Sequence, residues 1–192
     1  MQRDIPPYRA DHVGSLLRPL AVKQARSKYA AGQLSAAELK VIEDAEIKKI
    51  IAKQEEIGLR SVTDGELRRA YWHFDFLAVL DGVEMVEAQG IKFAGVASKA
   101  EAPFVKGKLS SRHHPQIAHF EFLKANTKCT PKMTIPSPSM LHYRGGRNMI
   151  DRAAYPTMEE FYRDLGQAYR QAIRGFYAAG CRYLQLDDCS FA

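Results

Sequence analysis

The same short pattern occurs twice in this sequence, and it limits the folds that the chain can adopt. Residues 35–58 and 157–180 each read as a helix that begins with a capping box and ends at a glycine. A β-prone run and then carboxylates follow each glycine, in Val62-Thr-Asp64-Gly-Glu66 and in Leu184-Gln-Leu-Asp187-Asp188. Because parallel strands need a crossover of about a dozen residues or more, this is the second half of a β-α-β repeat. The pattern predicts an α/β fold with parallel strands.

Five segments are predicted as strands, each followed by small or polar residues. They are 8–13, the run between Gly58 and Asp64, 103–109, 132–135 and 183–186. Besides the two capped helices, helical segments are predicted near 20–31, 70–81 and 115–126. Residues 83–101 have the character of a β-hairpin with Gly90 near its turn, and 141–147 that of a strand-to-helix loop able to bind an anion.

Two architectures fit strands that alternate with helices: a doubly wound sheet and a (β/α)8 TIM barrel. A doubly wound sheet normally has a glycine-rich phosphate loop after its first strand. Here that position reads HVGSLLRP, and neither GxGxxG nor GxxxxGK occurs in the chain. We therefore favour the barrel, which typically needs about 250 residues and eight strands. Residues 1–192 are expected to form the N-terminal part of a single TIM-barrel catalytic domain, with about the first five strands.

Composition excludes several classes of protein. With 46% hydrophobic and 26% charged residues, the chain has the balance of a soluble globular protein. It has no apolar run of about 18 residues and no apolar N-terminal signal, so we expect it to be cytoplasmic, with no membrane partner. The net charge is +6, but the basic residues are scattered, so we expect no nucleic-acid partner. The three cysteines lack CxxC spacing and are expected to be reduced and mostly buried.

In a barrel the C-terminal ends of the strands meet at one mouth, and the polar residues there are candidates for a site. The candidates are His12, Ser15, Asp64, Glu66 and Asp187, with further hydroxyls and a carboxylate at Ser110, Ser111, Ser137, Ser139 and Asp188. Structural roles stay open for four of them: Asp64 can begin a turn with Gly65, His12 can bond a backbone carbonyl, and Ser15 and Ser110 can cap the helices that follow. Asp187 is harder to explain structurally, because a carboxylate that ends an apolar strand must be paired or exposed at a site.

Four motifs in order along the chain resemble one known family. They are DHVGSLLRP at 11–19, VTDGE at 62–66, MTIPSPSML at 133–141 and YLQLDD at 183–188. Together they are similar to the cobalamin-independent methionine synthase family, in particular its short single-barrel members. The resemblance runs through almost the whole chain. It implies a (β/α)8 barrel of the type shared with uroporphyrinogen decarboxylase.

The resemblance also implies an activity and a substrate site. Members of the family use zinc, not cobalamin, to hold homocysteine as a thiolate that takes a methyl group from methyltetrahydrofolate. In this comparison Ser15 resembles the residue that contacts the amino acid's carboxylate. Glu66 and Asp187 resemble the carboxylates that hold its ammonium group. The expected partners are therefore a homocysteine-like thiol amino acid and a methyltetrahydrofolate-like donor.

The family's zinc ligands are a His-x-Cys pair, a glutamate and a second cysteine, all on strands after the fifth. This chain contains no His-x-Cys, so we expect its zinc ligands beyond residue 192 and neither metal-ligating nor catalytic residues within it. The chain alone is then expected to be inactive. Its open strand edges are expected to self-associate or to pair with a complementing C-terminal chain. The alternatives are zinc-dependent alkyl transfer to another thiol such as coenzyme M, or a non-catalytic half-barrel that serves in binding or assembly.

Overall fold

The computed structural model describes residues 4–87, 101–143 and 145–189. These residues form two compact units. The first contains residues 4–72, 118–134 and 179–185, and the second contains 73–87, 101–117, 135–143, 145–178 and 186–189. The chain thus passes several times between the units, and each unit combines segments that are distant in sequence.

The described residues contain helices and strands in mixed order. The α-helices are α1 (Leu20–Ala30), α2 (Ala36–Glu56), α3 (Phe74–Leu77), α4 (Gln116–Ala125) and α5 (Met158–Ala178). Two 3-10 helices are η1 (Pro138–Leu141) and η2 (Gly146–Met149). The strands are β1 (Ser61–Val62), β2 (Asp81–Glu87), β3 (Glu101–Ser110), β4 (Thr130–Pro131), β5 (Met133–Pro136) and β6 (Leu184–Asp187).

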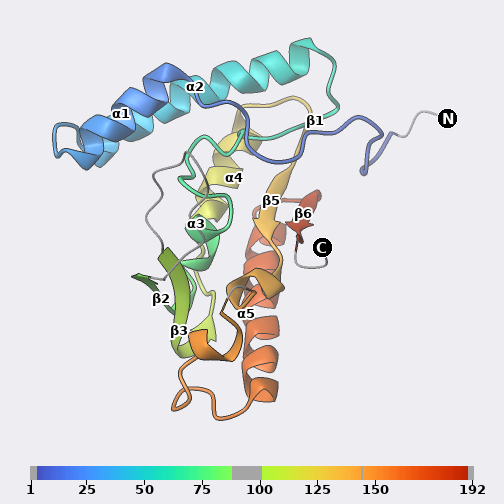
Figure 1. Cartoon of the computed structure of the whole chain (residues 1–192). Helices are drawn as coiled ribbons and strands as arrows, with labels where there is room; N and C mark the ends of the chain where they lie inside the picture. Colours follow the sequence, from blue (N-terminus) through green and yellow to red (C-terminus); the bar gives the residue numbers. More distant parts are fainter. Residues whose placement is uncertain (1–3, 88–100, 144, 190–192) are drawn as a thin grey trace. The chain divides into compact units, whose positions relative to one another are not determined.

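In the first unit, α1 and α2 pack against each other (Figure 1). One face of α2 contributes Ile47 and Ile51 to a buried cluster that also holds Val62, Leu67 and Leu123. These two isoleucines are four residues apart, so they lie on the same side of the helix. Strand β1 pairs in parallel with β4. Through this cluster, α2 packs against β1 and against Leu67, which follows that strand.

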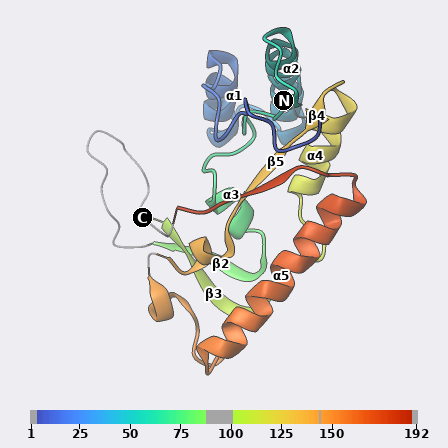
Figure 2. The same ribbon diagram turned by 90° about the vertical axis from the view of Figure 1, so that its right-hand side faces the viewer.

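In the second unit, α5 packs against β3 (Figure 2). The buried side chains of α5 recur every three or four residues and form one face: Phe161, Leu165, Ala168, Tyr169, Ala172 and Phe176. Strand β3 pairs antiparallel with β2. The buried Tyr155 ties this layer together, because its hydroxyl accepts the Leu109 N–H at 2.7 Å. Burial raises the pKa of Tyr155 to about 12.

Most of the predicted helices are confirmed. The segments 20–31, 35–57, 115–126 and 157–179 match α1, α2, α4 and α5. At the start of α2, Ser35 and Glu38 form both halves of the capping box. At the start of α5, the Thr157 hydroxyl accepts the Glu160 N–H at 3.3 Å. Local capping chemistry was therefore sufficient to place the beginnings of both long helices.

The predicted helix at 70–81 is largely wrong, because only Phe74–Leu77 is helical. Residues 81–87 instead form β2, which pairs with residues 101–110. The prediction of a strand at 103–109 separate from a hairpin at 83–101 therefore divided this region wrongly. Both segments belong to one antiparallel pair of strands. The sequence of neither strand indicated which segment it would pair with. The expected turn near Gly90 lies outside the described residues.

The strands of the described segments pair as three two-stranded sheets: β1 with β4, β2 with β3, and β5 with β6. In the last pair, the Met133 N–H bonds to the Tyr183 carbonyl at 3.0 Å and the Ser137 N–H to the Asp187 carbonyl at 2.8 Å. Since both partners advance by four residues, the two strands are parallel. The parallel β1–β4 and β5–β6 pairs agree with the predicted α/β class, whereas the expected succession of five parallel strands is not observed here.

The predicted strand at 8–13 is also wrong, because this segment is irregular. Side chains hold it in place of a strand ladder. Asp11 accepts bonds from Ser61 Oγ and from Lys132 Nζ, each at 2.7 Å, and a further short bond from the Tyr183 hydroxyl. Lys132 is 1% exposed and also donates to the His12 carbonyl at 2.8 Å. Polar side chains thus bond this segment to the first unit.

The charge on Asp11 is stabilised by these contacts. Burial alone would raise its pKa, but the hydrogen bonds from Lys132, Tyr183 and Ser61 outweigh burial and lower the pKa below the ordinary value of 3.8. Burial, together with the bond to Asp11, raises the pKa of Tyr183 to about 12. At neutral pH the group therefore consists of an ionised Asp11 and a neutral tyrosine.

A first prediction concerns how much the capping box of Ser35 and Glu38 stabilises the folded protein. We expect Ser35→Ala to lower the free energy of unfolding by about 1 kcal/mol, because it removes an N-cap acceptor and exposes an unpaired N–H. Urea unfolding followed by circular dichroism measures the change. Ser27→Ala, at an exposed position inside α1, is the control and should not destabilise the protein. Equal losses for the two variants would contradict the role of the box.

A second prediction concerns the ion pair between Asp11 and the buried Lys132. Asp11→Asn leaves the buried Lys132 without its counter-charge, and we expect a loss of about 3 kcal/mol at pH 7. Because the folded-state pKa of Asp11 is lowered, its contribution is complete above about pH 4 and disappears as the pH falls through the folded-state pKa. The gap between wild type and variant should be constant from pH 7 to 5 and should narrow in stronger acid.

Urea titrations at a series of pH values measure this gap. Asp4→Asn is the control, since Asp4 forms an exposed ion pair with Arg60 and should contribute less than about 0.5 kcal/mol. A gap that stays constant below pH 3 would show that Asp11 stabilises the fold without its charge.

Candidate functional site

The turn after β1 presents Glu66 in an unusual backbone conformation. Gly65 has φ 63° and Glu66 has φ 55°, so two successive residues are left-handed. The Asp64 carboxylate stabilises this turn by accepting the Glu66 N–H at 2.9 Å, and the Thr63 hydroxyl accepts the Gly65 N–H at 3.1 Å. A Cβ on residue 65 would lie 2.5 Å from Ile50 Cδ1, the movable end of that side chain, and 3.2 Å from Leu16 Cβ, so the positive φ is the main reason for glycine here.

Helix α2 holds the residue before this turn. The Gln54 amide donates to the Thr63 carbonyl at 2.9 Å and accepts the Thr63 N–H at 3.0 Å. This paired contact satisfies both backbone groups of Thr63, as a neighbouring strand would. Helix α2 therefore holds Thr63, the residue from which the chain enters the turn at Gly65 and Glu66.

The Glu66 side chain is 2% exposed and accepts three hydrogen bonds. Oε1 accepts from Thr134 Oγ1 at 2.9 Å and from Arg69 Nη1 at 3.3 Å, and Oε2 accepts from Ser15 Oγ at 2.5 Å. A carboxylate this deeply buried needs such partners, because burial penalises its charge. Two of the residues predicted for the site, Ser15 and Glu66, thus touch each other directly.

Ser15 reaches Glu66 from an exposed loop. The loop is held to the turn by the Leu16 N–H, which donates to the Gly65 carbonyl at 3.1 Å. Gly14 has φ 83°, and a Cβ there would meet nothing within 4 Å, so the space beside Ser15 is open. His12 lies before this glycine, with its Nε2 2.7 Å from the Gly14 carbonyl oxygen. The histidine therefore shapes the loop that carries Ser15.

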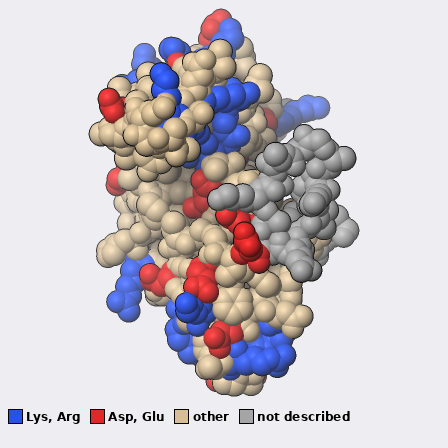
Figure 3. Space-filling view, turned by 60° about the vertical axis from the view of Figure 1, so that its left-hand side comes forward, with Lys and Arg blue, Asp and Glu red and all other residues tan. Residues whose placement is uncertain are grey.

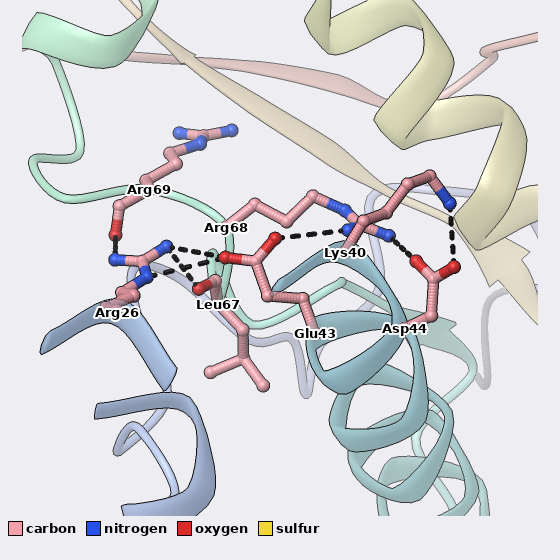
Figure 4. A network of polar contacts seen from close by, with 7 residues as sticks. All are labelled: Arg26, Lys40, Glu43, Asp44, Leu67, Arg68 and Arg69. Atoms are coloured by element: carbon pink, nitrogen blue, oxygen red, sulfur yellow. Dashed lines mark hydrogen bonds and ion pairs between the residues drawn. The ribbon is translucent and has the colours of Figure 1, made fainter. Parts of the chain in front are cut away.

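A second set of contacts holds residues 67–69, which follow the Glu66 turn (Figure 4). Arg26 of α1 donates to the backbone carbonyls of Leu67 and Arg69, each at 2.7 Å. Its guanidinium also pairs with Glu43 of α2 at 3.2 Å, and Glu43 in turn pairs with Arg68 at 3.3 Å. Residues 67–69 are thereby bonded to both helices through charged side chains. Such bonds are stronger than neutral ones.

Asp187 belongs to the second unit and ends β6. Its carbonyl accepts the Ser137 N–H at 2.8 Å, and its residue is partly exposed. The following residue, Asp188, is exposed and accepts from Ser139 Oγ at 3.3 Å. The sequence thus placed both carboxylates correctly at the end of a strand, beside the serines that follow β5.

The described part of the chain does not supply a metal site. Among residues 4–87, 101–143 and 145–189, no group of three or more His, Cys, Asp or Glu is arranged to hold a metal ion. The cysteines are free: Cys129 is half-buried, Cys181 is buried and Cys189 is exposed. The expectation of mostly buried thiols is wrong for Cys189, which follows the end of β6. Burial raises the pKa of Cys181, which disfavours the thiolate that zinc binds.

The surface agrees with the scattered charge of the sequence. Figure 3 shows Lys and Arg side chains in several groups on the visible face, with Asp and Glu among them. Within the segments that the structure describes, no helix is long and apolar enough to cross a membrane.

Sequence reasoning missed Arg69, Thr134 and Lys132. A signal for the first was available, because Glu66 and Arg69 are three residues apart, a spacing at which opposite charges often meet. Thr134 and Lys132 are joined to their partners across more than sixty residues of sequence. No local pattern indicates contacts of that kind.

Known proteins are similar in sequence to most of this chain. A family model described as "Cobalamin-independent synthase, Catalytic domain" matches residues 10–192. One relative is YxjH of Bacillus subtilis (strain 168), described as an uncharacterized protein. It is 51% identical over 188 residues, which cover 97% of this chain and 49% of YxjH. A 5-methyltetrahydropteroyltriglutamate–homocysteine methyltransferase of Synechococcus sp. (strain JA-2-3B'a(2-13)) is 28% identical over 188 residues, covering 97% of this chain and 24% of that enzyme.

A solved structure gives the fold. The putative vitamin-B12 independent methionine synthase from Listeria monocytogenes superposes with a TM-score of 0.83 and 46% identity, covering 98% of this chain and 54% of that one. The α/β fold is therefore similar to that of a B12-independent methionine synthase. This chain spans about half the length of YxjH and of the Listeria protein. With the family model matched from residue 10 to residue 192, the chain belongs to the cobalamin-independent methionine synthase family.

Proposed function

We propose that this chain supplies the amino-acid-binding part of a methyltransferase that transfers a methyl group from methyltetrahydrofolate to homocysteine. The match of the family's catalytic-domain model to residues 10–192 carries the proposal. The direct contact between Ser15 and Glu66, two residues that the family resemblance assigns to the amino acid, supports it. Homocysteine offers an ammonium, a carboxylate and a thiol, and the first two need charged or polar partners on the protein.

In the proposed site, Glu66 binds the ammonium group through Oε2. Oε1 already accepts from Thr134 and Arg69, whereas the partner of Oε2 is the hydroxyl of the exposed Ser15. A hydroxyl can rotate, so Ser15 can turn its proton from Glu66 towards the carboxylate of the ligand. The ammonium group then takes its place at Oε2 in a charge-assisted hydrogen bond. The family resemblance assigns Asp187 to an ammonium contact as well, and that assignment is tested separately below.

Zinc, which the family uses, would keep the substrate thiol deprotonated when bound. The described residues do not fit such a site, as the raised pKa of Cys181 and the lack of a ligand cluster among them indicate. We therefore assign no zinc ligand to residues 4–87, 101–143 or 145–189, and place the ligands in a part of the enzyme other than these segments. The fold is proposed to be part of a (β/α)8 barrel.

Binding of homocysteine tests the assignment of the two carboxylates. We expect Glu66→Gln and Asp187→Asn each to weaken homocysteine roughly ten- to a hundred-fold, because a lost charged hydrogen bond costs about 1.5–3 kcal/mol. Isothermal titration calorimetry measures the affinity, with 2-mercaptoethanesulfonate as a thiol that lacks the amino-acid group. Asp188→Asn and Glu46→Gln are the controls, since the first changes the neighbouring carboxylate and the second an ion-paired surface carboxylate.

Two results would contradict this proposal. Unchanged homocysteine affinity in both Glu66→Gln and Asp187→Asn would show that the carboxylates are structural. Binding of 2-mercaptoethanesulfonate in preference to homocysteine would show that the natural thiol is not an amino acid.

Metal content gives an independent prediction. We expect the purified 192-residue chain to bind less than stoichiometric zinc and to form no methionine from homocysteine and methyltetrahydrofolate. A thiol with an ordinary pKa of about 8.5 is mostly protonated at neutral pH without a metal. Inductively coupled plasma mass spectrometry and a methionine assay measure the two quantities. One zinc ion per chain, or turnover at about 1 s⁻¹ or faster, would contradict the placement of the ligands.

A further inference from the structure

Arg69 is one of the largest fully buried side chains in the protein, and it lies beside Glu66. Its residue is 2% exposed, as is that of Glu66. In Figure 4 its carbonyl faces Arg26, while its guanidinium points away from that network. A buried cation is costly unless its donors are bonded, so the partners of this guanidinium indicate why it is there.

The guanidinium bonds to three partners on two segments of the first unit. Nη2 donates to the Thr134 carbonyl at 2.5 Å, and Nη1 donates to the Trp72 carbonyl at 3.2 Å and to Glu66 Oε1 at 3.3 Å. Two of these partners are backbone carbonyls whose positions are set by the fold. Arg69 therefore connects the carboxylate to fixed points on β5 and on its own loop.

These contacts fix the orientation of the Glu66 carboxylate. Arg69 and the Thr134 hydroxyl both bond to Oε1, so that oxygen is directed towards β5. A carboxylate is planar and rigid, and holding one oxygen by two donors directs the other. Oε2 accordingly points to Ser15, on the exposed loop.

We propose that Arg69 is a positioning residue that holds Glu66 with Oε2 directed to Ser15, so that this oxygen is the one that receives the ligand's ammonium group. The second part of this inference rests on the proposed function, whereas the first part concerns the protein alone. A lysine cannot replace Arg69 fully, because a single ammonium group lacks the planar fork that reaches carbonyl and carboxylate together.

The chain offers a closely matched control in Arg68. This neighbouring arginine has a side chain that is 6% exposed and pairs with Glu43 and Asp44 of α2. It is also buried and ion-paired, but it does not bond to Glu66. If Arg69 only stabilises the fold, Arg68→Met and Arg69→Met should have similar effects.

The first experiment needs no ligand. The carboxyl carbon of Glu66 is followed by ¹³C NMR in wild type and in the variants Arg69→Met, Arg69→Lys and Arg68→Met, each checked for folding by circular dichroism. We expect the Glu66 signal to shift or broaden in Arg69→Met, to move partly in Arg69→Lys, and to stay at the wild-type position in Arg68→Met. An unchanged Glu66 signal in both Arg69 variants would overturn the proposal. If Arg69→Met does not fold, the lysine variant decides.

The second experiment compares homocysteine with 4-mercaptobutyrate, which has the same chain without the ammonium group. We expect Arg69→Met to weaken homocysteine about ten-fold and 4-mercaptobutyrate less than about two-fold, because the lost orientation affects only the ammonium contact. Equal losses for both ligands would show a general structural effect and overturn the inference about Oε2. If wild type binds neither ligand, the proposed function and the role given to Oε2 fail together, whereas the NMR result still decides whether Arg69 positions Glu66.

Discussion

The burial of one carboxylate constrains this part of the molecule more than any other interaction. Glu66 is 2% exposed on a left-handed turn, and a charge in that position is tolerable only if each oxygen is bonded. The structure provides three donors from three segments: Ser15, Arg69 and Thr134. Because these segments come from sequence positions up to about 120 residues apart, satisfying Glu66 requires the N-terminal loop, the β1 turn and β5 to meet.

Two further charged groups keep these segments in place. The Asp11–Lys132 pair fixes the segment before Ser15, and Arg26 with Glu43 fixes residues 67–69 behind the turn. Neither group includes Glu66 itself. Both are ion pairs with buried or partly buried members, in which geometry is enforced because an unpaired charge would be expensive. The first unit thus places its polar pairs around the candidate site, while its apolar cluster lies between α2, β1 and α4.

How far the sequence predicted this arrangement depended on whether the signal was local. The capping boxes at Ser35 and Thr157 and the glycines after each helix placed the two long helices, since those signals act within a few residues. The same holds for the carboxylates after β1 and β6. The strand partners were not predictable, because β-prone residues at 103–109 suit an antiparallel arm as well as a barrel strand.

The same distinction between local signals and contacts of distant segments applies to the candidate site. Motif resemblance identified Ser15 and Glu66, but gave no indication that they bond to each other or that Thr134 completes the carboxylate's partners. Asp64 was left open between ligand binding and a turn, and its bond to the Glu66 N–H gives it a place in the turn. For His12, the short contact with the Gly14 carbonyl matches the structural alternative, although the residue is only partly buried. Side-chain networks of this kind depend on the tertiary fold and leave no periodic pattern in the sequence.

The pairing of Glu66 with Arg69 also determines how this carboxylate can attract a charged ligand. One negative and one positive charge cancel at a distance, so the buried pair attracts an ammonium group by a directed hydrogen bond more than by net charge. A ligand that also carries a carboxylate gains little from such a neutral pair in long-range attraction. In the proposed function Glu66 therefore contributes chiefly through the direction of its Oε2, which the donors on Oε1, Arg69 and Thr134, set from the other side of the carboxylate.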